Sequence, residues 1–135
     1  MIAVDTSVVV ASFATWHEGH EASLEVMGKR PRLPAQVLAE AYSVLTRLPP
    51  PHRVASHLVA EFLKDRLGEP PLQIGSENLA ALVVSASARG ITGGAIYDAI
   101  VAATALEHGA RLFTRDLRAQ LVYREVGVDF ELALG

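Results

Sequence analysis

Four acidic residues carry the chemistry that this sequence could perform. They fall at or near the ends of predicted strands and helices that are far apart in the chain: Asp5, Glu40, Asp98 and Asp116. In open α/β sheets, ligands bind at the carboxyl ends of the parallel strands. Three of the acids map to that edge, whereas Glu40 is placed less firmly because an exposed helical glutamate is usually solvated surface.

Carboxylates gathered in one place repel one another. Two unit charges about 4 Å apart cost about 4 kcal/mol at an effective dielectric constant of 20. Either some of the acids are protonated or cations hold them. Oxygen ligands select hard cations such as Mg²⁺ or Mn²⁺. The chain has no cysteine, and no histidine is near these acids in the sequence, which disfavours a zinc site. A carboxylate site of this kind suits phosphodiester chemistry.

The segment that organises the chain surrounds Asp98. We predict a helix that begins near Gly94 or Ala95 and ends at His108, with Gly109 as its left-handed cap. Its residues are apolar nearly all round, which predicts burial on most sides. A short strand over residues 111–114 follows directly. An acid in a first turn could also simply favour the helix dipole, by about 0.3–1 kcal/mol.

The rest of the chain predicts alternating short strands and helices. Further helices are expected at residues 8–13 (capped by Thr6 or Ser7), 16–28, 34–48, 53–67, 76–90 (capped by Ser76) and 117–126. Further strands are expected at residues 2–4, around Leu33 and at 128–132, with an extended connector or strand at 70–74. This alternation predicts one domain over residues 1–135, an α/β fold of three α/β/α layers around a small, mostly parallel sheet.

Composition narrows the function classes. Half of the 135 residues are apolar, which indicates a globular protein. The net charge of −3 argues against a protein that coats nucleic acid by general electrostatics. No stretch reaches the roughly 18 consecutive apolar residues of a membrane span. The N-terminus lacks the basic region of a signal peptide. We therefore expect a soluble, cytoplasmic protein.

Several short motifs together resemble a PIN-domain ribonuclease. They are Val4-Asp5-Thr6-Ser7, Glu40, Ile96-Tyr97-Asp98-Ala99 with Ala102-Ala103, and Gly109-Ala110-Arg111-Leu112-Phe113-Thr114-Arg115-Asp116. The chain length and the ending Arg118-Ala119, Tyr123 and Gly127-Val128 resemble the VapC toxins of bacterial toxin–antitoxin pairs. The resemblance spans essentially the whole chain. Its most specific part is the Tyr-Asp-Ala helix joined to the Thr-Arg-Asp strand end.

The resemblance implies a Mg²⁺- or Mn²⁺-dependent endoribonuclease. By matched position, Asp5 and Asp98 would be the principal metal ligands, and Glu40 and Asp116 would complete the pocket directly or through water. Hydroxyl groups would orient these carboxylates, from Thr6, Ser7 and Thr114. Water would attack the phosphorus in line and leave a 5′-phosphate and a 3′-hydroxyl. The resemblance also implies a homodimer and a cognate antitoxin that pushes a basic side chain toward the acids.

Basic and aromatic residues give weaker signals. Arg115 and Arg118 flank Asp116 and could contact RNA, although surface ion pairs are an equal alternative. The run at residues 29–32 is more consistent with a solvated turn than with RNA contact. His17 and His20 have a helical spacing that could bind metal, but no third ligand accompanies them. Trp16 could stack a base, although core packing or partner contact is the more common role.

Two other classes of function stay open. An aspartyl-phosphate phosphatase or receiver domain also places an acid after its first strand. However, Ser7 stands where the phosphatase motif has a second acid. A receiver domain has a lysine after its last strands, but no lysine follows Lys64 in this chain. A non-catalytic RNA- or protein-binding module is the other class. A pure RNA binder would gain nothing from four acids.

Overall fold

The sheet at the centre of the protein has parallel strands and is small. A computed structural model describes residues 1–134, so Gly135, the last residue of the predicted domain, lies outside it. Strands β1 (Ile2–Val4), β2 (Arg111–Thr114) and β3 (Phe130–Leu132) pair in the order β1-β2-β3. Val4 lies opposite Phe113, and Thr114 lies opposite Leu132. Isolated parallel bridges extend the sheet beyond β1, from Ala3 to Arg32 and from Pro34 to Leu72.

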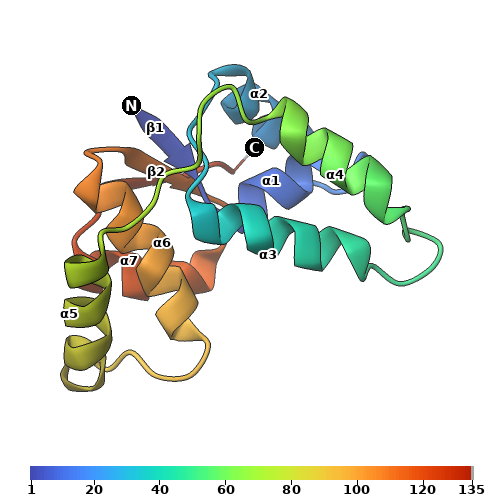
Figure 1. Cartoon of the computed structure of the whole chain (residues 1–135). Coiled ribbons are helices and arrows are strands. Elements are labelled where there is room, and N and C mark those ends of the chain that lie inside the picture. The colour runs from blue at the N-terminus through green and yellow to red at the C-terminus, as the bar shows by residue number, and fades with distance from the viewer. Residues whose placement is uncertain (135) are drawn as a thin grey trace.

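Helices cover both faces of this sheet. They are α1 (Thr6–Phe13), α2 (His20–Gly28), α3 (Ala35–Thr46), α4 (Ser56–Asp65), α5 (Ser76–Ala86), α6 (Ala95–Glu107) and α7 (Gln120–Val126), with 3₁₀ turns η1 (Ser87–Arg89) and η2 (Leu117–Ala119). The strands lie between α1, α2 and α4 on one side and α6 and α7 on the other (Figure 1). The α/β fold with a small parallel sheet is therefore confirmed.

The core explains why so short a sheet is stable. Small residues of α6 are fully buried and let it pack closely on β2 and α7: Ala99, Ala102 and Ala105. The Thr104 hydroxyl is satisfied within α6 by the carbonyl of Ile100, at 2.6 Å. Val4, Val8 and Leu112 continue the same core without exposure. Because α6 is held from several sides, the acid in its first turn has a fixed position.

The predicted ends of two helices are confirmed, each followed by a glycine. Gly109 (φ 66°) follows α6 and Gly127 (φ 91°) follows α7, both in the left-handed conformation that glycine tolerates. The strand at residues 111–114 is also confirmed. Residues 130–132, rather than 128–132, form the final strand.

Three further local predictions are wrong. Residues 16–19 form a loop, and α2 begins only at His20. The N-cap of α1 is Asp5, whose side chain accepts a hydrogen bond from the Ser7 amide, so neither Thr6 nor Ser7 has that role. Gly75, not Ser76, precedes α5. Among residues 1–134, no helix is long and apolar enough to cross a membrane.

Candidate active site

All four predicted acids line one cavity. Asp5 stands at the end of β1, Glu40 on α3, Asp98 on α6 and Asp116 just after β2, around a space of about 510 Å³. The cavity lies at the carboxyl edge of the sheet, where α/β proteins bind ligands. The sequence prediction that placed three acids at this edge is confirmed. Glu40, the least certain of the four, joins them because α3 packs on α1.

Asp5 is the most buried of these acids, with 5% of its surface exposed. One carboxylate oxygen accepts hydrogen bonds from the Ser7 amide (3.0 Å) and hydroxyl, and the other from the hydroxyls of Thr114 and Tyr123 (2.7 Å). Burial raises the pKa of Asp5 above its usual value, and these hydrogen bonds oppose that rise. The carboxylate is therefore held in one orientation by its donors.

Tyr123 is a site residue that sequence reasoning did not identify as one. It is fully buried on α7, and its hydroxyl points to the inner oxygen of Asp5. Burial and the nearby Asp5 charge raise the pKa of Tyr123 strongly, so the phenol stays protonated and acts as a donor. A buried tyrosine needs a hydrogen-bond partner. The available signal was a tyrosine on a short helix next to the last acid.

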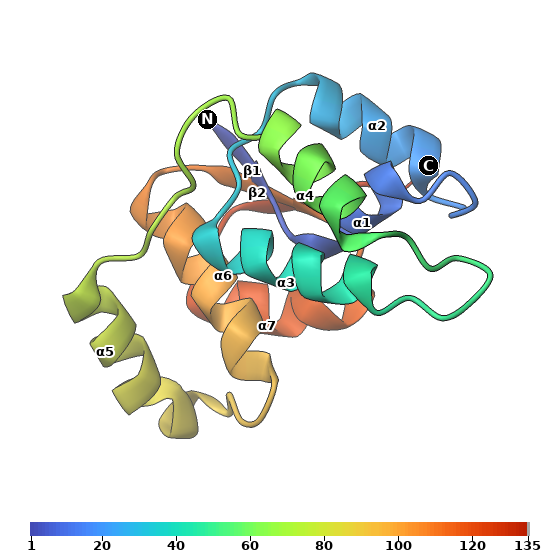
Figure 2. The same ribbon diagram turned by 45° about the vertical axis from the view of Figure 1, so that its right-hand side comes forward.

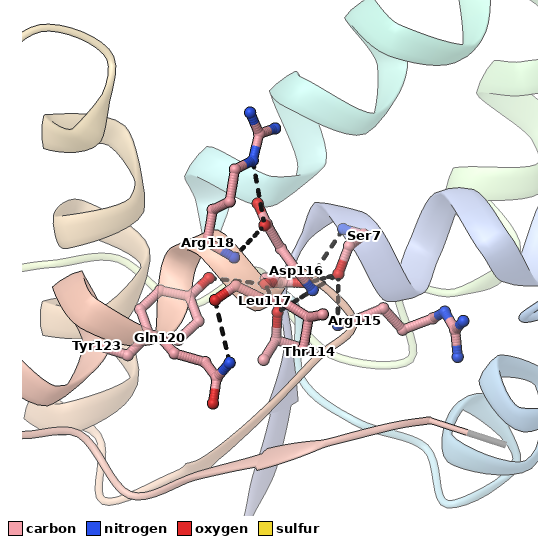
Figure 3. Close-up of polar contacts among 9 residues, drawn as sticks. Ser7, Thr114, Arg115, Asp116, Leu117, Arg118, Gln120 and Tyr123 are labelled. Carbon is pink, nitrogen blue, oxygen red and sulfur yellow. Dashed lines mark hydrogen bonds and ion pairs between the residues drawn. The ribbon is translucent and has the colours of Figure 1, made fainter.

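The predicted orienting hydroxyls link the strand ends to each other. Thr114 accepts a hydrogen bond from the amide of Asp116 (3.0 Å), and Ser7 accepts one from the amide of Arg115 (2.7 Å). These contacts tie the start of α1 to the end of β2 (Figure 3). The backbone that carries Asp116 is thereby fixed relative to Asp5.

Glu40 is oriented by two donors. The Thr6 hydroxyl lies 3.2 Å from one carboxylate oxygen, and the Gln36 amide, one turn earlier on α3, lies 2.7 Å from the other. Thr6 therefore orients Glu40. It does not orient Asp5, its neighbour in the sequence. A glutamate that is fixed by two donors differs from the solvated surface residue that its sequence position alone suggested.

Asp98 and Asp116 complete the pocket. Burial is the main cause that raises the pKa of Asp98 to about 6, and the charges of Asp116, Asp5 and Glu40 raise it further. Asp98 lies in the first turn of α6, where the helix dipole also favours an acid. The Asp116 carboxylate accepts a hydrogen bond from the Arg118 amide at 2.9 Å.

The donor set fits a hard divalent cation. The acids present oxygen ligands only, and their mutual repulsion is what a bound cation would relieve. No three histidine, aspartate or glutamate side chains in residues 1–134 are close enough to form a ready-made ligand cluster. Mg²⁺ commonly binds one or two carboxylates and keeps several waters. The wide acidic pocket is suited to that mode of binding.

His17 and Glu18 also line the cavity, although no histidine is near the acids in the sequence. His17 comes from the loop that sequence analysis took for helix. Its Nδ1 accepts a hydrogen bond from the Gly19 amide at 2.9 Å, whereas His20 Nδ1 bonds the Ala11 carbonyl at 2.9 Å. The two rings have different backbone partners and do not act as an i, i+3 metal pair.

The two arginines point away from each other (Figure 3). Arg115 reaches the carbonyl of Ala133, and its Nε is buried. Its guanidinium thus has a packing role, unlike the RNA contact considered from sequence. Arg118 is almost fully exposed, with 97% of its side chain accessible, 4.0 Å from Asp116. Only Arg118 keeps the freedom that a contact with RNA would need.

Without divalent cations, the protein is expected to gain stability as the pH falls from about 7 to 4. The pKa of Asp98 is about 6 when folded, against 3.8 for the free side chain, so the folded state binds the proton more tightly. This contribution is fully present below 3.8 and is lost as the pH rises through 6. Asp98 is half-buried, and solvent screening keeps the effect to about 1 kcal/mol.

Thermal melts in EDTA at a series of pH values test this expectation. Asp98→Asn should show a flatter pH profile between 4 and 6. Saturating Mg²⁺ should stabilise the wild-type protein at neutral pH, because the cation takes the place of the proton. An unchanged profile in Asp98→Asn would show that other groups cause the dependence.

Comparisons with known proteins agree with this site. A model of the PIN domain matches residues 2–125. Ribonuclease VapC40 of Mycobacterium tuberculosis is 48% identical over 132 residues, 98% of each chain. Ribonuclease VapC27 of the same organism is 41% identical over 133 residues, 98% of this chain and 96% of that protein.

Solved structures show the same fold. FitAB bound to the IR36 DNA fragment has a TM-score of 0.70 at 20% identity, over 98% of this chain and 95% of that one. VapBC2 from Rickettsia felis, bound to a promoter DNA fragment, has a TM-score of 0.66 at 16% identity, over 98% of each chain. With a family model that matches most of its length and relatives above 40% identity, the chain belongs to the PIN-domain family, among the VapC ribonucleases.

Proposed function

We propose that the acidic pocket of this VapC-family ribonuclease hydrolyses RNA phosphodiester bonds with the help of Mg²⁺ or Mn²⁺. Asp5 and Asp98 would be the principal ligands, and Glu40 and Asp116 would bind directly or through water. The observation that carries the proposal is the meeting of these acids in one cavity, where crowding contributes to the raised pKa of Asp98. RNA, itself an anion, could approach such a pocket only with cations present.

A bound divalent cation supplies a Lewis acid for the phosphate and lowers the pKa of a water molecule. The neighbouring side chains hold and orient the carboxylates that would bind this cation. Tyr123, Thr114 and Ser7 fix the Asp5 oxygens, and Thr6 and Gln36 fix Glu40. Water oxygen attacks phosphorus, the bond to the 3′ oxygen breaks, and that oxygen takes up a proton. The products are a 5′-phosphate and a 3′-hydroxyl.

The chain is the toxin, an endoribonuclease, of a toxin–antitoxin pair. Its partner in this proposal is a cognate antitoxin that places a basic side chain near the acids, and the toxin forms a homodimer. A cation from the antitoxin would satisfy the same crowded carboxylates that Mg²⁺ satisfies. Such binding would exclude metal and substrate together.

Cleavage of RNA by the purified chain, with defined metals, tests the proposal. We expect cleavage with Mg²⁺ or Mn²⁺, none in EDTA, and ends that accept an adapter specific for 5′-phosphate. Co-purified antitoxin should suppress cleavage. Activity in EDTA, or 2′,3′-cyclic phosphate ends, would refute the metal-dependent mechanism.

The aspartyl-phosphate alternative is weaker. A phosphorylated aspartate must offer an oxygen to the incoming phosphoryl group, but both Asp5 oxygens already accept hydrogen bonds and the residue is buried. Beryllofluoride, a phosphate mimic, should therefore not bind. A non-catalytic RNA-binding module is likewise disfavoured, because four acids around one cavity weaken RNA binding when no cation is held.

A further inference from the structure

A row of three aromatic rings leads from the surface to the acidic cavity. The indole of Trp16 stacks on the His52 imidazole, with ring centroids 4.1 Å apart and planes at 25°. The ring centroid of Trp16 also lies 6.0 Å from that of His17, which lines the cavity. Trp16 belongs to the α1–α2 loop and His52 to the α3–α4 loop, which protrude from the same side of the molecule (Figure 2).

This row is held in a fixed position relative to the acids. The His17 amide donates to the Ala14 carbonyl at 2.9 Å, and the His20 amide donates to the His17 carbonyl at 3.1 Å. Gly19 lies so close to Arg115 that an added Cβ would come within 2.1 Å of the guanidinium carbon. Because the amide of Arg115 also donates to Ser7, beside Asp5, loop and pocket form one unit.

Trp16 presents an accessible aromatic surface that a ligand could use. Half of its surface (51%) is accessible, although large aromatic side chains normally bury most of theirs. Its neighbours in the loop, Thr15 and Glu18, are polar and exposed. A protein partner generally needs a broad apolar patch, whereas an unpaired base needs only a flat ring and a nearby backbone site.

We propose that Trp16, supported by His52, is a stacking platform for an unpaired base of single-stranded RNA next to the scissile phosphate. This inference rests on the proposed ribonuclease function of the cavity and specifies its substrate as unpaired RNA. Stacking suits any base, because every base has a flat aromatic face. A paired base in a helix has both faces covered and could not use the platform.

His17 links the platform to the cavity. Its Nδ1 accepts the Gly19 amide hydrogen, so the neutral ring carries its proton on Nε2. Within the described residues, Nε2 makes no hydrogen bond. It is therefore a donor that can bind a phosphate oxygen of the nucleotide whose base stacks on Trp16. Stacked base and bound phosphate would together set the register of the strand over the acids.

Kinetics on a short unpaired RNA test the platform. Trp16→Ala should raise KM about tenfold and leave kcat nearly unchanged, because the contact is made in both ground and transition states. Trp16→Phe should restore most of the affinity. Val84→Ala removes an exposed apolar side chain of α5 and serves as the matched control, with no expected change. A single abasic nucleotide beside the cleavage site should weaken wild-type cleavage but not that of Trp16→Ala.

A binding measurement separates failure of the platform from failure of the nuclease. Trp16 is the only tryptophan, so its fluorescence should be quenched by unpaired RNA in Ca²⁺ buffer, and much less by the same RNA in a duplex. Quenching without cleavage in Mg²⁺ would refute the nuclease but support the platform. If Trp16→Ala cleaved RNA with the KM of the wild type, and an abasic nucleotide weakened its cleavage as it does that of the wild type, the platform would be refuted. If Trp16→Ala lost only antitoxin binding and cleaved RNA as the wild type does, the platform would also be refuted.

Discussion

Asp98→Asn is expected to lower Mg²⁺-dependent RNA cleavage by at least about 100-fold while the fold becomes no less stable. The variant removes one charged ligand from the pocket, and a held cation supplies several kcal/mol of transition-state stabilisation. It also removes a carboxylate whose pKa burial and neighbouring charges raise to about 6. In metal-free buffer the variant should therefore melt at the same or a higher temperature than the wild-type protein.

The matched control is Asp129→Asn. Asp129 is an exposed acid that pairs with Arg111 at 3.5 Å and does not line the cavity. Initial rates on one RNA substrate, with thermal melts in EDTA for each protein, give the comparison. Equal cleavage by wild type and Asp98→Asn would exclude Asp98 as a ligand. Unfolding of Asp98→Asn would instead show a structural role.

Asp5→Ala is expected to destabilise the protein by about 2–4 kcal/mol, which is a fall in Tm of roughly 10 °C. The substitution takes away the acceptor for the Ser7 amide and for the buried hydroxyls of Thr114 and Tyr123. Each buried donor without a partner costs about 1–3 kcal/mol. The hydroxyls recover part of that cost, since Ser7 and Thr114 already lie 3.5 Å apart.

Asp5→Asn separates charge from hydrogen bonding at the same position. The amide oxygen can still accept from Ser7, and the amide nitrogen can donate to the rotatable hydroxyls of Thr114 or Tyr123. Because it also removes a charge that burial disfavours, we expect its stability within about 1 kcal/mol of wild type. Its cleavage should nevertheless fall as in Asp98→Asn. Urea unfolding of both variants measures the difference, and equal stability would contradict the hydrogen-bond account.

Local patterns gave much of the architecture. The apolar helix of α6, its glycine stop and the strand that follows were readable because each depends on neighbouring residues only. The loop at residues 16–19 could not be predicted, because its mixture of apolar and charged residues resembles the start of a helix. What distinguishes it is tertiary: Gly19 has to leave room for the guanidinium of Arg115.

The sequence by itself determined which residues are acids, that most of them stand at strand or helix ends, and that these ends meet at one edge of a parallel sheet. Only the tertiary structure decided how each acid is oriented. Tyr123 reaches Asp5 across 118 positions and Thr6 reaches Glu40 across 34. No local preference specifies such partners, since they depend on how α7 and α3 pack. The same packing brought His17 to the cavity and turned Arg115 to Ala133.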